Sequence, residues 1–473
     1  MAVTRLVPTD VVLPSLALLL DNRAMQGLFE QQLRERRGNG AAITECEIER
    51  IKYRPRRNCL VGYKIKLRDT TGERAQRLFA GIYAEEDAVA RYQKAMTEAS
   101  IASADFAPVA LIRPLAMVLW AFPNERKLRA LPLLSDAGQL RETLLPDVVR
   151  SRWGGNWTIA HISHAVSNYF PEHSCCVNVT LSLRHSGGGA PRTWEILGKT
   201  RDDDAGAQTY RQMATLYRGA DSDVSYARPL AYQSKHRVLW QERVPGVTLH
   251  SLLASGVADR ALLIRVARAV AALHGKPAVS PQRVMLSDLI DRLIAAGAVV
   301  AAANPRCEDP LRQTIDALTE RARCLDLRHN ATWHGDLHSK NILVAPTLIY
   351  LVDMDRVAVG PPLADLGSFL AELVYRDCWN GKPLQALQPA VNSIVAAYRG
   401  RVSWPVQEEE IAWYTASALI HERALRCVTS LKPMHTQTLD RLVSTAARIA
   451  GGDLFARSPA LAGSVVRERG RAQ

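Results

Sequence analysis

The sequence predicts an α+β protein built from two β-rich units of similar design and a mostly helical C-terminal region. Two observations support this fold class. A strand-rich segment occurs twice at an offset of about 115 to 120 residues, and beyond about residue 247 apolar residues recur at helical spacing. Because 473 residues exceed the usual size of one compact core, we expect units at 1–150, 151–245 and 246–473.

The internal repeat rests on four short matches that follow one another in the same order. Each copy has a polar turn between its strands and a helix after them. Lys199 in the second copy corresponds to Ile82 in the first. The matched segments are Asn58–Val61 with Ser174–Val177, Phe79–Ile82 with Ile196–Lys199, Arg113–Ala116 with Arg228–Ala231, and Val118–Trp120 with Val238–Trp240.

The helical region contains several amphipathic stretches and one short strand-like island, which runs from Asn341 to Val357. We expect helices over Leu262–Leu273, Leu286–Ala302, Leu311–Leu325, Ile411–Leu425 and Leu439–Ile449.

Composition excludes several classes of protein. Apolar residues make up 47% and charged residues 23%, which are values of ordinary globular proteins. The net charge of +13 is spread along the chain without a nucleic-acid-binding motif, so we expect no nucleic-acid partner. The eight cysteines lack metal-ligand spacing and indicate a reducing compartment.

The only long apolar run near the N-terminus, Val11 to Leu20, is ten residues long and is interrupted by Pro14. It is too short for a membrane span and lacks the features of a signal peptide. We therefore expect no membrane insertion and a cytoplasmic location.

The strand-like island carries the main functional signal, the sequence Trp333-His334-Gly335-Asp336-Leu337-His338-Ser339-Lys340-Asn341 followed by Asp353 after an apolar strand. An Asp, an Asn five positions later and an Asp twelve positions after that have the spacing of a kinase phosphoryl-transfer site. Asp336 would accept the proton of the attacking hydroxyl, and Asn341 and Asp353 would supply oxygen ligands for Mg²⁺. Turn capping by these residues is the structural alternative.

At these residues the chain resembles the aminoglycoside phosphotransferase and choline kinase-like family, whose loop reads H-G-D-x-H-x-x-N. The resemblance implies a bilobal protein-kinase-like fold, ATP and Mg²⁺ as cofactors, and a small-molecule hydroxyl acceptor. Asp336 matches the family's catalytic base, and Asn341 and Asp353 match its metal positions. Gly335 stands where protein kinases usually have Arg, and Asp365 matches a family position that we expect to be structural.

The nucleotide side is expected in the second β-rich unit. Lys199, at the end of an apolar strand, fits the cation that contacts the nucleotide phosphates. The segment containing Glu242 and Val244 resembles the family's hinge, where backbone groups bond adenine. The loop Val166–Cys175 contains no glycine, and the helix after Lys199 offers Gln208, Gln212 or a nearby Asp, but no clear Glu, as its partner.

The first unit has Ile82 in place of the lysine and no second catalytic loop, so it is expected to be a cap or scaffold. Its Arg54, Arg56 and Arg57 form either a solvated basic loop or a contact for an anionic substrate. For the acceptor, aromatic and acidic residues of the C-terminal helices are candidates, with helix packing as the alternative. They are Trp404, Glu408–Glu410, Trp413, Tyr414, His421 and Glu422.

Taken together, the sequence predicts an ATP- and Mg²⁺-dependent small-molecule kinase that phosphorylates a sugar, amino alcohol, aminoglycoside or similar acceptor. A nucleotide-binding pseudokinase that regulates a partner has the same fold and is the main alternative. A protein kinase would need an A-P-E-like anchor after Asp353, and the sequence has none.

Overall fold

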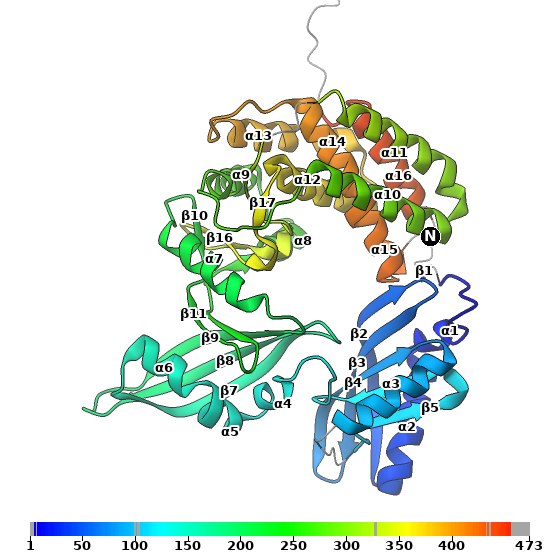
Figure 1. Cartoon of the computed structure of the whole chain (residues 1–473), viewed down its shortest axis with the longest axis vertical. Coiled ribbons are helices and arrows are strands. Elements are labelled where there is room, and N and C mark those ends of the chain that lie inside the picture. Colours follow the sequence, from blue (N-terminus) through cyan, green and yellow to red (C-terminus); the bar gives the residue numbers. More distant parts are fainter. Residues whose placement is uncertain are drawn as a thin grey trace, which may run out of the picture.

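The computed structural model describes residues 4–5, 7–98, 101, 105–325, 329–431, 433–434 and 437–455. Two five-stranded sheets lie side by side at one end of the molecule, and a helical region lies across the other end (Figure 1). This arrangement is the predicted α+β architecture.

The N-terminal unit is an antiparallel sheet in the order β2-β3-β4-β6-β5. One face of the sheet packs against α1 and α2, and the other packs against α3. Its strands are β2 (Ala41–Arg54), β3 (Asn58–Asp69), β4 (Gly72–Ile82), β5 (Val109–Ile112) and β6 (Met117–Ala121), and its helices are α1 (Leu16–Leu19), α2 (Asn22–Arg37) and α3 (Glu85–Glu98).

The second sheet has the order β7-β8-β9-β12-β11, which is the strand order of the first sheet. The repeat predicted from the sequence is therefore confirmed in the topology. The strands are β7 (Trp157–Phe170), β8 (Ser174–His185), β9 (Arg192–Arg201), β11 (Pro229–Gln233) and β12 (Val238–Glu242), and α7 (Gly206–Arg218) follows β9.

Strand register and packing correct one residue of the alignment of the two copies. Cys59 and Cys175 both lie in the core between their sheet and the helices that precede it, as the sequence match implies. Cys59 lies opposite Ile82, whereas Cys175 lies opposite Thr200. Ile82 therefore corresponds to Thr200, and the expected match of Ile82 with Lys199 is wrong by one residue, which decides the face of the sheet that a side chain occupies.

Ile82 and Lys199 lie on different faces of their sheets. Ile82 is buried in the core between the sheet and α2, together with Phe29 and Val61. Lys199 lies opposite Leu239, which packs in one core with residues of α7. A charged side chain at position 82 would be buried without a partner, which is costly.

The segment that connects the two sheets packs against the second one. Residues from Leu128 to Val149 share a core with β7, β8, β9 and β12. We therefore propose that the division between the two units falls between β6 and α4, earlier than residue 150. The connecting helices are α4 (Leu131–Leu134), α5 (Ala137–Gln139), η3 (Leu140–Leu144) and α6 (Pro146–Trp153).

The second sheet and α7 form the small lobe expected from the sequence, and the chain passes from β12 into a helical large lobe. Small sheets in the order β10-β16-β15-β13 and β14-β17 line the large lobe where the lobes meet. Their strands are β10 (Val224–Tyr226), β13 (Val247–Thr248), β14 (Ala331–Trp333), β15 (Ile342–Val344), β16 (Ile349–Leu351) and β17 (Ala358–Gly360).

The helices of the large lobe surround one apolar core. They are α8 (Leu249–Ala254), α9 (Arg260–His274), α10 (Leu286–Ala303), α11 (Glu308–Ala322), α12 (Pro362–Trp379), α13 (Gln388–Arg399), α14 (Glu408–Ala418), η8 (Leu419–Ala424), α15 (Leu425–Thr429) and α16 (Thr438–Ala450).

The remaining elements are short. They are β1 (Thr4–Arg5), which pairs with β18 (Pro433–Met434), and the turns of 3₁₀-helix η1 (Gly38–Gly40), η2 (Arg113–Leu115), η4 (Pro305–Cys307), η5 (Ser339–Asn341), η6 (Met354–Arg356) and η7 (Leu384–Ala386). In the described part of the chain, every helix is too short or too polar to cross a lipid bilayer.

Candidate active site

A buried carboxylate holds the loop between β14 and η5. Asp365, in the first turn of α12, accepts hydrogen bonds from the backbone N–H groups of His334 (2.6 Å) and Gly335 (3.0 Å). Its Oδ2 also lies 3.1 Å from Nε2 of His274. Asp365 is 1% exposed, so water cannot take over its hydrogen bonds to these groups. These contacts give Asp365 a structural role, as the sequence led us to expect.

Replacing Asp365 with Asn should destabilise the protein. The amide group has one acceptor oxygen, so one of the two loop N–H groups would lose its partner and face an NH₂ group. An unsatisfied buried donor costs about 1–3 kcal/mol. Urea unfolding should show this loss. Asp309→Asn, which alters an exposed ion pair with Arg312, is the control and should change stability by less than about 0.5 kcal/mol. Equal stability of the two variants would contradict the anchoring role.

Gly335 adopts a left-handed conformation with φ of +79°. A Cβ atom at this position would lie 2.6 Å from the carbonyl oxygen of Arg356. The site therefore excludes the Arg that protein kinases usually have here, for steric reasons as well as conformational ones.

His334 connects the loop to strand β16. Its Nε2 lies 3.0 Å from the carbonyl oxygen of Val352, so Nε2 carries a proton, and its Nδ1 accepts from the N–H of Asp336 at 3.3 Å. The ring is fully buried. Because both nitrogens are engaged by backbone groups, His334 organises the loop, whereas the side chain of Asp336 is partly exposed.

The three residues that the sequence placed at the reaction centre lie together. Nδ2 of Asn341 donates to the carbonyl oxygen of Asp336 (3.0 Å), and the carbonyl oxygen of Asn341 accepts from the N–H of Val352 (3.0 Å). Asp353 follows Val352 directly. Asn341 is thus bonded to both segments that carry the acidic residues, and it joins them.

Asp353 has an unusual backbone conformation for a residue with a side chain. Its φ and ψ angles are 65° and 59°, in the left-handed region that costs non-glycine residues of order 1–3 kcal/mol. Its Oδ1 lies 2.5 Å from Nζ of Lys199. Burial raises the pKa of Asp353, but the Lys199 ammonium and its hydrogen bond outweigh burial, and the pKa is lowered overall.

Lys199 pairs with two carboxylates across the cleft, because its Nζ also lies 2.7 Å from Oδ2 of Asp355. Burial lowers the pKa of Lys199, but the charges of Asp353 and Asp355 outweigh burial and raise it. Gln208 and Gln212 bond Ser280 and the carbonyl of Val357 instead. The partners of Lys199 are thus Asp353 and Asp355, and not the residues next to the following helix that the sequence suggested.

The predicted hinge residues lie at the end of β12 and just beyond it. The N–H of Glu242 donates to the carbonyl oxygen of Arg228 (2.9 Å), and its carboxylate pairs with Arg152 (2.9 Å). The N–H of Glu242 is therefore occupied within the protein. Val244 is partly buried against the core of the large lobe.

The donor set fits a magnesium ion bound together with phosphates. Nδ2 of Asn341 is used within the loop, so its Oδ1 and the Asp353 carboxylate are the oxygen donors at the site. The described residues contain no cluster of three His, Cys, Asp or Glu side chains that could hold a metal alone. Such a site suits Mg²⁺, which usually binds one or two carboxylates plus water and substrate phosphates.

Comparison with known families identifies this region. Residues 185–398 match the family model described as "Phosphotransferase enzyme family". This part of the chain is similar to the members of that family. The match spans Lys199, the hinge and the Asp336 loop, so the predicted enzyme class, a phosphotransferase, is confirmed. It leaves out the N-terminal unit and the last helices.

Solved structures resemble this phosphotransferase distantly. A choline/ethanolamine kinase family protein from Mesorhizobium loti has 16% identity, covers 57% of this chain and 84% of its own, and has a TM-score of 0.40. An aminoglycoside phosphotransferase from Streptomyces rimosus has 18% identity, covers 59% of this chain and 96% of its own, and has a TM-score of 0.37. A macrolide 2'-phosphotransferase from Brachybacterium faecium has 14% identity, covers 66% of this chain and 98% of its own, and has a TM-score of 0.40. No curated protein matches in sequence.

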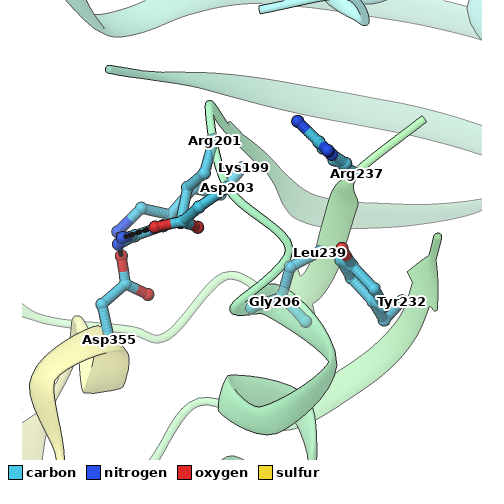
Figure 2. Close-up of a pocket in the computed structure, with 8 residues that line it drawn as sticks. All are labelled: Lys199, Arg201, Asp203, Gly206, Tyr232, Arg237, Leu239 and Asp355. Atoms are coloured by element: carbon cyan, nitrogen blue, oxygen red, sulfur yellow. Dashed lines mark hydrogen bonds and ion pairs between the residues drawn. The ribbon is translucent and has the colours of Figure 1, made fainter. Parts of the chain in front are cut away.

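A small pocket of the phosphotransferase lies beside the lysine. Figure 2 shows Arg201, Asp203 and Asp355 directed toward one another on one side, with Arg237 and Tyr232 on the other. Arg201 bonds Asp355 and also pairs with Asp203 at 2.7 Å. The pocket therefore has several cations whose charges are largely balanced by aspartates.

The glycine-free turn between β7 and β8 is held by the N-terminal unit. Glu172, which is 9% exposed and has a φ of +58°, lies between Arg91, Arg126 and Lys127 at 3.6 to 3.9 Å. Its N–H donates to Glu125 (2.7 Å). In kinases the corresponding turn covers the phosphates. In this phosphotransferase, the turn is glycine-free and is held by ion pairs from outside the second sheet.

Several acceptor candidates from the sequence are packing residues. Trp413 is buried and donates from Nε1 to the carbonyl of Leu318 (2.7 Å), and Tyr414 is buried beside it. Trp404 stacks on His329 with 4.3 Å between ring centroids. Glu422 bonds Ser368 and lies 3.6 Å from His421. Packing is thus the better account of Trp413 and Tyr414.

Proposed function

We propose that the chain is an ATP- and Mg²⁺-dependent kinase that phosphorylates a hydroxyl group of a small molecule such as a sugar, amino alcohol or aminoglycoside. The observation that carries the proposal is the meeting of Asp336, Asn341 and Asp353 with Lys199 where the lobes face each other. A reducing compartment that contains ATP, the cytoplasm, suits such an enzyme and its eight free cysteines.

Each residue has a defined task in this proposal. Asp336 takes the hydroxyl proton while the oxygen–phosphorus bond forms, the bond between the γ-phosphorus and the bridging oxygen breaks, and ADP leaves. Asn341 and Asp353 would hold Mg²⁺, which neutralises charge on the phosphates. Lys199 contacts the α- and β-phosphates, and backbone groups of Glu242 and Val244 bind adenine.

The test is Mg²⁺-dependent formation of ADP from ATP with a panel of sugars, amino alcohols, aminoglycosides and nucleosides. The proposal expects an acceptor that raises the rate above hydrolysis. If nucleotide binds but no acceptor is phosphorylated and no ATP is hydrolysed, the pseudokinase is the better account.

Lys199→Gln should mainly weaken engagement of ATP. The amide cannot neutralise the phosphates, so we expect KM for ATP to rise roughly tenfold or more, which is about 1.4 kcal/mol of binding. Steady-state kinetics with varied MgATP measure this change. Lys235→Gln, at an exposed position between β11 and β12, is the control. An unchanged KM in the Lys199 variant would mean that another group contacts the phosphates.

A further inference from the structure

The N-terminal unit contributes one arginine to the space between the lobes. Arg50, on β2, donates from Nη2 to Oδ1 of Asn168 (3.0 Å), and its guanidinium lies 3.6 Å from the ring centroid of Phe170. Asn168 and Phe170 are both on β7, so Arg50 crosses from the first sheet to the second.

Strand register places Arg50 on the face of the second sheet that carries Lys199. Asn168 lies opposite Cys176, and Cys176 lies opposite Lys199. Directly opposed residues of antiparallel strands project on the same face. Asn168, Cys176 and Lys199 therefore form a row across three strands. Because neighbouring strands are about 4.8 Å apart, Asn168, which Arg50 contacts, lies roughly 10 Å from Lys199.

A second arginine reaches the same space from the large lobe. Strand β2 contacts α15 (Figure 1), and α15 carries the exposed Arg426. Burial lowers the pKa of Arg50, and the charge of Arg426 lowers it further. Arg426 therefore belongs to the helix of the large lobe that lies against the strand of Arg50.

Neither arginine has an acidic partner. The hydrogen bond of Arg50 goes to a neutral amide, and no described carboxylate lies within 4.0 Å of either guanidinium. The acidic groups nearby are engaged elsewhere: Glu49 pairs with Arg77, Glu372 bonds Ser339, and Glu422 bonds Ser368. Arg50 is partly buried and Arg426 is exposed; two neighbouring cations repel each other, and a bound anion would relieve that repulsion.

We propose that Arg50 and Arg426 bind a negatively charged group, phosphate or carboxylate, on the acceptor. This proposal rests on the kinase function proposed above and narrows its substrates to anionic ones. Arg50 lies on the side of Asn168 and Phe170, two strands away from Lys199, whereas we expect the nucleotide phosphates at Lys199 and Asp353. A cationic aminoglycoside would be repelled here. The N-terminal unit then supplies part of the acceptor site.

The proposal is tested by phosphate binding to the full chain with its nucleotide site saturated by MgAMP-PNP. Titration calorimetry with inorganic phosphate should show saturable binding, weakened roughly tenfold or more in Arg50→Gln and in Arg426→Gln, since charge-assisted hydrogen bonds are lost. Arg57→Gln, exposed in the β2–β3 turn, is the matched control and should bind like the wild type. Absence of binding, or equal binding by all variants, overturns the proposal.

Two further measurements distinguish an anionic group on the acceptor from the phosphates of the nucleotide. Arg50→Gln should leave MgAMP-PNP affinity within about threefold; a larger loss that accompanies unchanged phosphate binding would assign Arg50 to the nucleotide and overturn the proposal. Wild-type kcat/KM should be higher for phosphorylated or carboxylated sugars than for their neutral counterparts, and Arg50→Gln should remove the difference. Arg426 is exposed, so its variant should fold even if that of Arg50 does not.

Failure of the inference and failure of the proposed function give different results. Arginine-dependent phosphate binding without phosphoryl transfer to any acceptor would keep the anion site and remove the kinase function. Transfer to neutral acceptors, unaffected by either arginine, would keep the kinase and remove the anion site.

Discussion

Asp336→Asn should lower kcat by roughly 10²- to 10⁴-fold, the usual contribution of a positioned general base. The amide has nearly the shape of the carboxylate but cannot accept the proton of the attacking hydroxyl. The backbone of Asp336 would still bond His334 and Asn341, so the loop should keep its form. Steady-state kinetics with the best acceptor measure the change, and KM for ATP should change little.

Two controls keep this result interpretable. Thermal unfolding should be similar for the wild type and the Asp336 variant, because the side chain makes no buried hydrogen bond in the described part of the structure. Asp309→Asn, on the exposed surface of α11, should retain full activity. Turnover by Asp336→Asn within about threefold of the wild type would remove Asp336 from the role of base.

Asp353→Asn should abolish the effect of Mg²⁺ on nucleotide binding. A carboxylate is the charged oxygen ligand at this site, and an amide binds Mg²⁺ much more weakly because it lacks the charge. The ammonium of Lys199 would also lose one of its two partners. Calorimetry of ATP binding with and without Mg²⁺ should show a large difference for the wild type and almost none for the variant.

The matched control for this prediction is Asp203→Asn, which alters a carboxylate of the neighbouring pocket that pairs with Arg201. It removes a negative charge near the nucleotide but no predicted metal ligand, so Mg²⁺ should still strengthen nucleotide binding. Equal Mg²⁺ dependence in the Asp353 variant and the wild type would show that the metal binds elsewhere.

The reaction centre could be predicted because its residues are close in sequence. Asp336, Asn341 and Asp353 lie within one loop-and-hairpin segment, so short-range geometry brings them together. Lys199 is distant in sequence but occupies the end of a strand in a recognisable unit. The pairing of Lys199 with Asp355 as well as Asp353 could not be foreseen, because it depends on how closely the lobes approach.

The anionic site could not be predicted for the same reason. The sequence drew attention to Arg54, Arg56 and Arg57, but their side chains are exposed. Arg50 is the residue that contacts the second sheet. The pairing of β2 with β3 shifts between Ile48 and Arg50, and such a shift changes the face on which a side chain lies. Single-sequence patterns do not report such a shift.

The helices show the same limit. Amphipathic helices such as α9, α10 and α16 were predicted near their observed bounds, since each has one apolar face. Helix α12 was not singled out, because residues 362–374 are buried or nearly so on all sides, which removes the periodicity. The β-repeat was visible because its turns and strands recur in order, whereas its register needed the hydrogen-bonded pairs.

The account depends most on the claim that Asp336, Asn341 and Asp353 surround a metal-bound triphosphate. Phosphorus NMR of AMP-PNP with Mn²⁺ in place of Mg²⁺ tests this claim without knowledge of the acceptor. Mn²⁺ at substoichiometric concentration should broaden the β- and γ-phosphorus signals when the wild-type chain is present, and the protein-dependent part should disappear in Asp353→Asn. Broadening that is the same for both proteins, or the same as in their absence, would contradict the account.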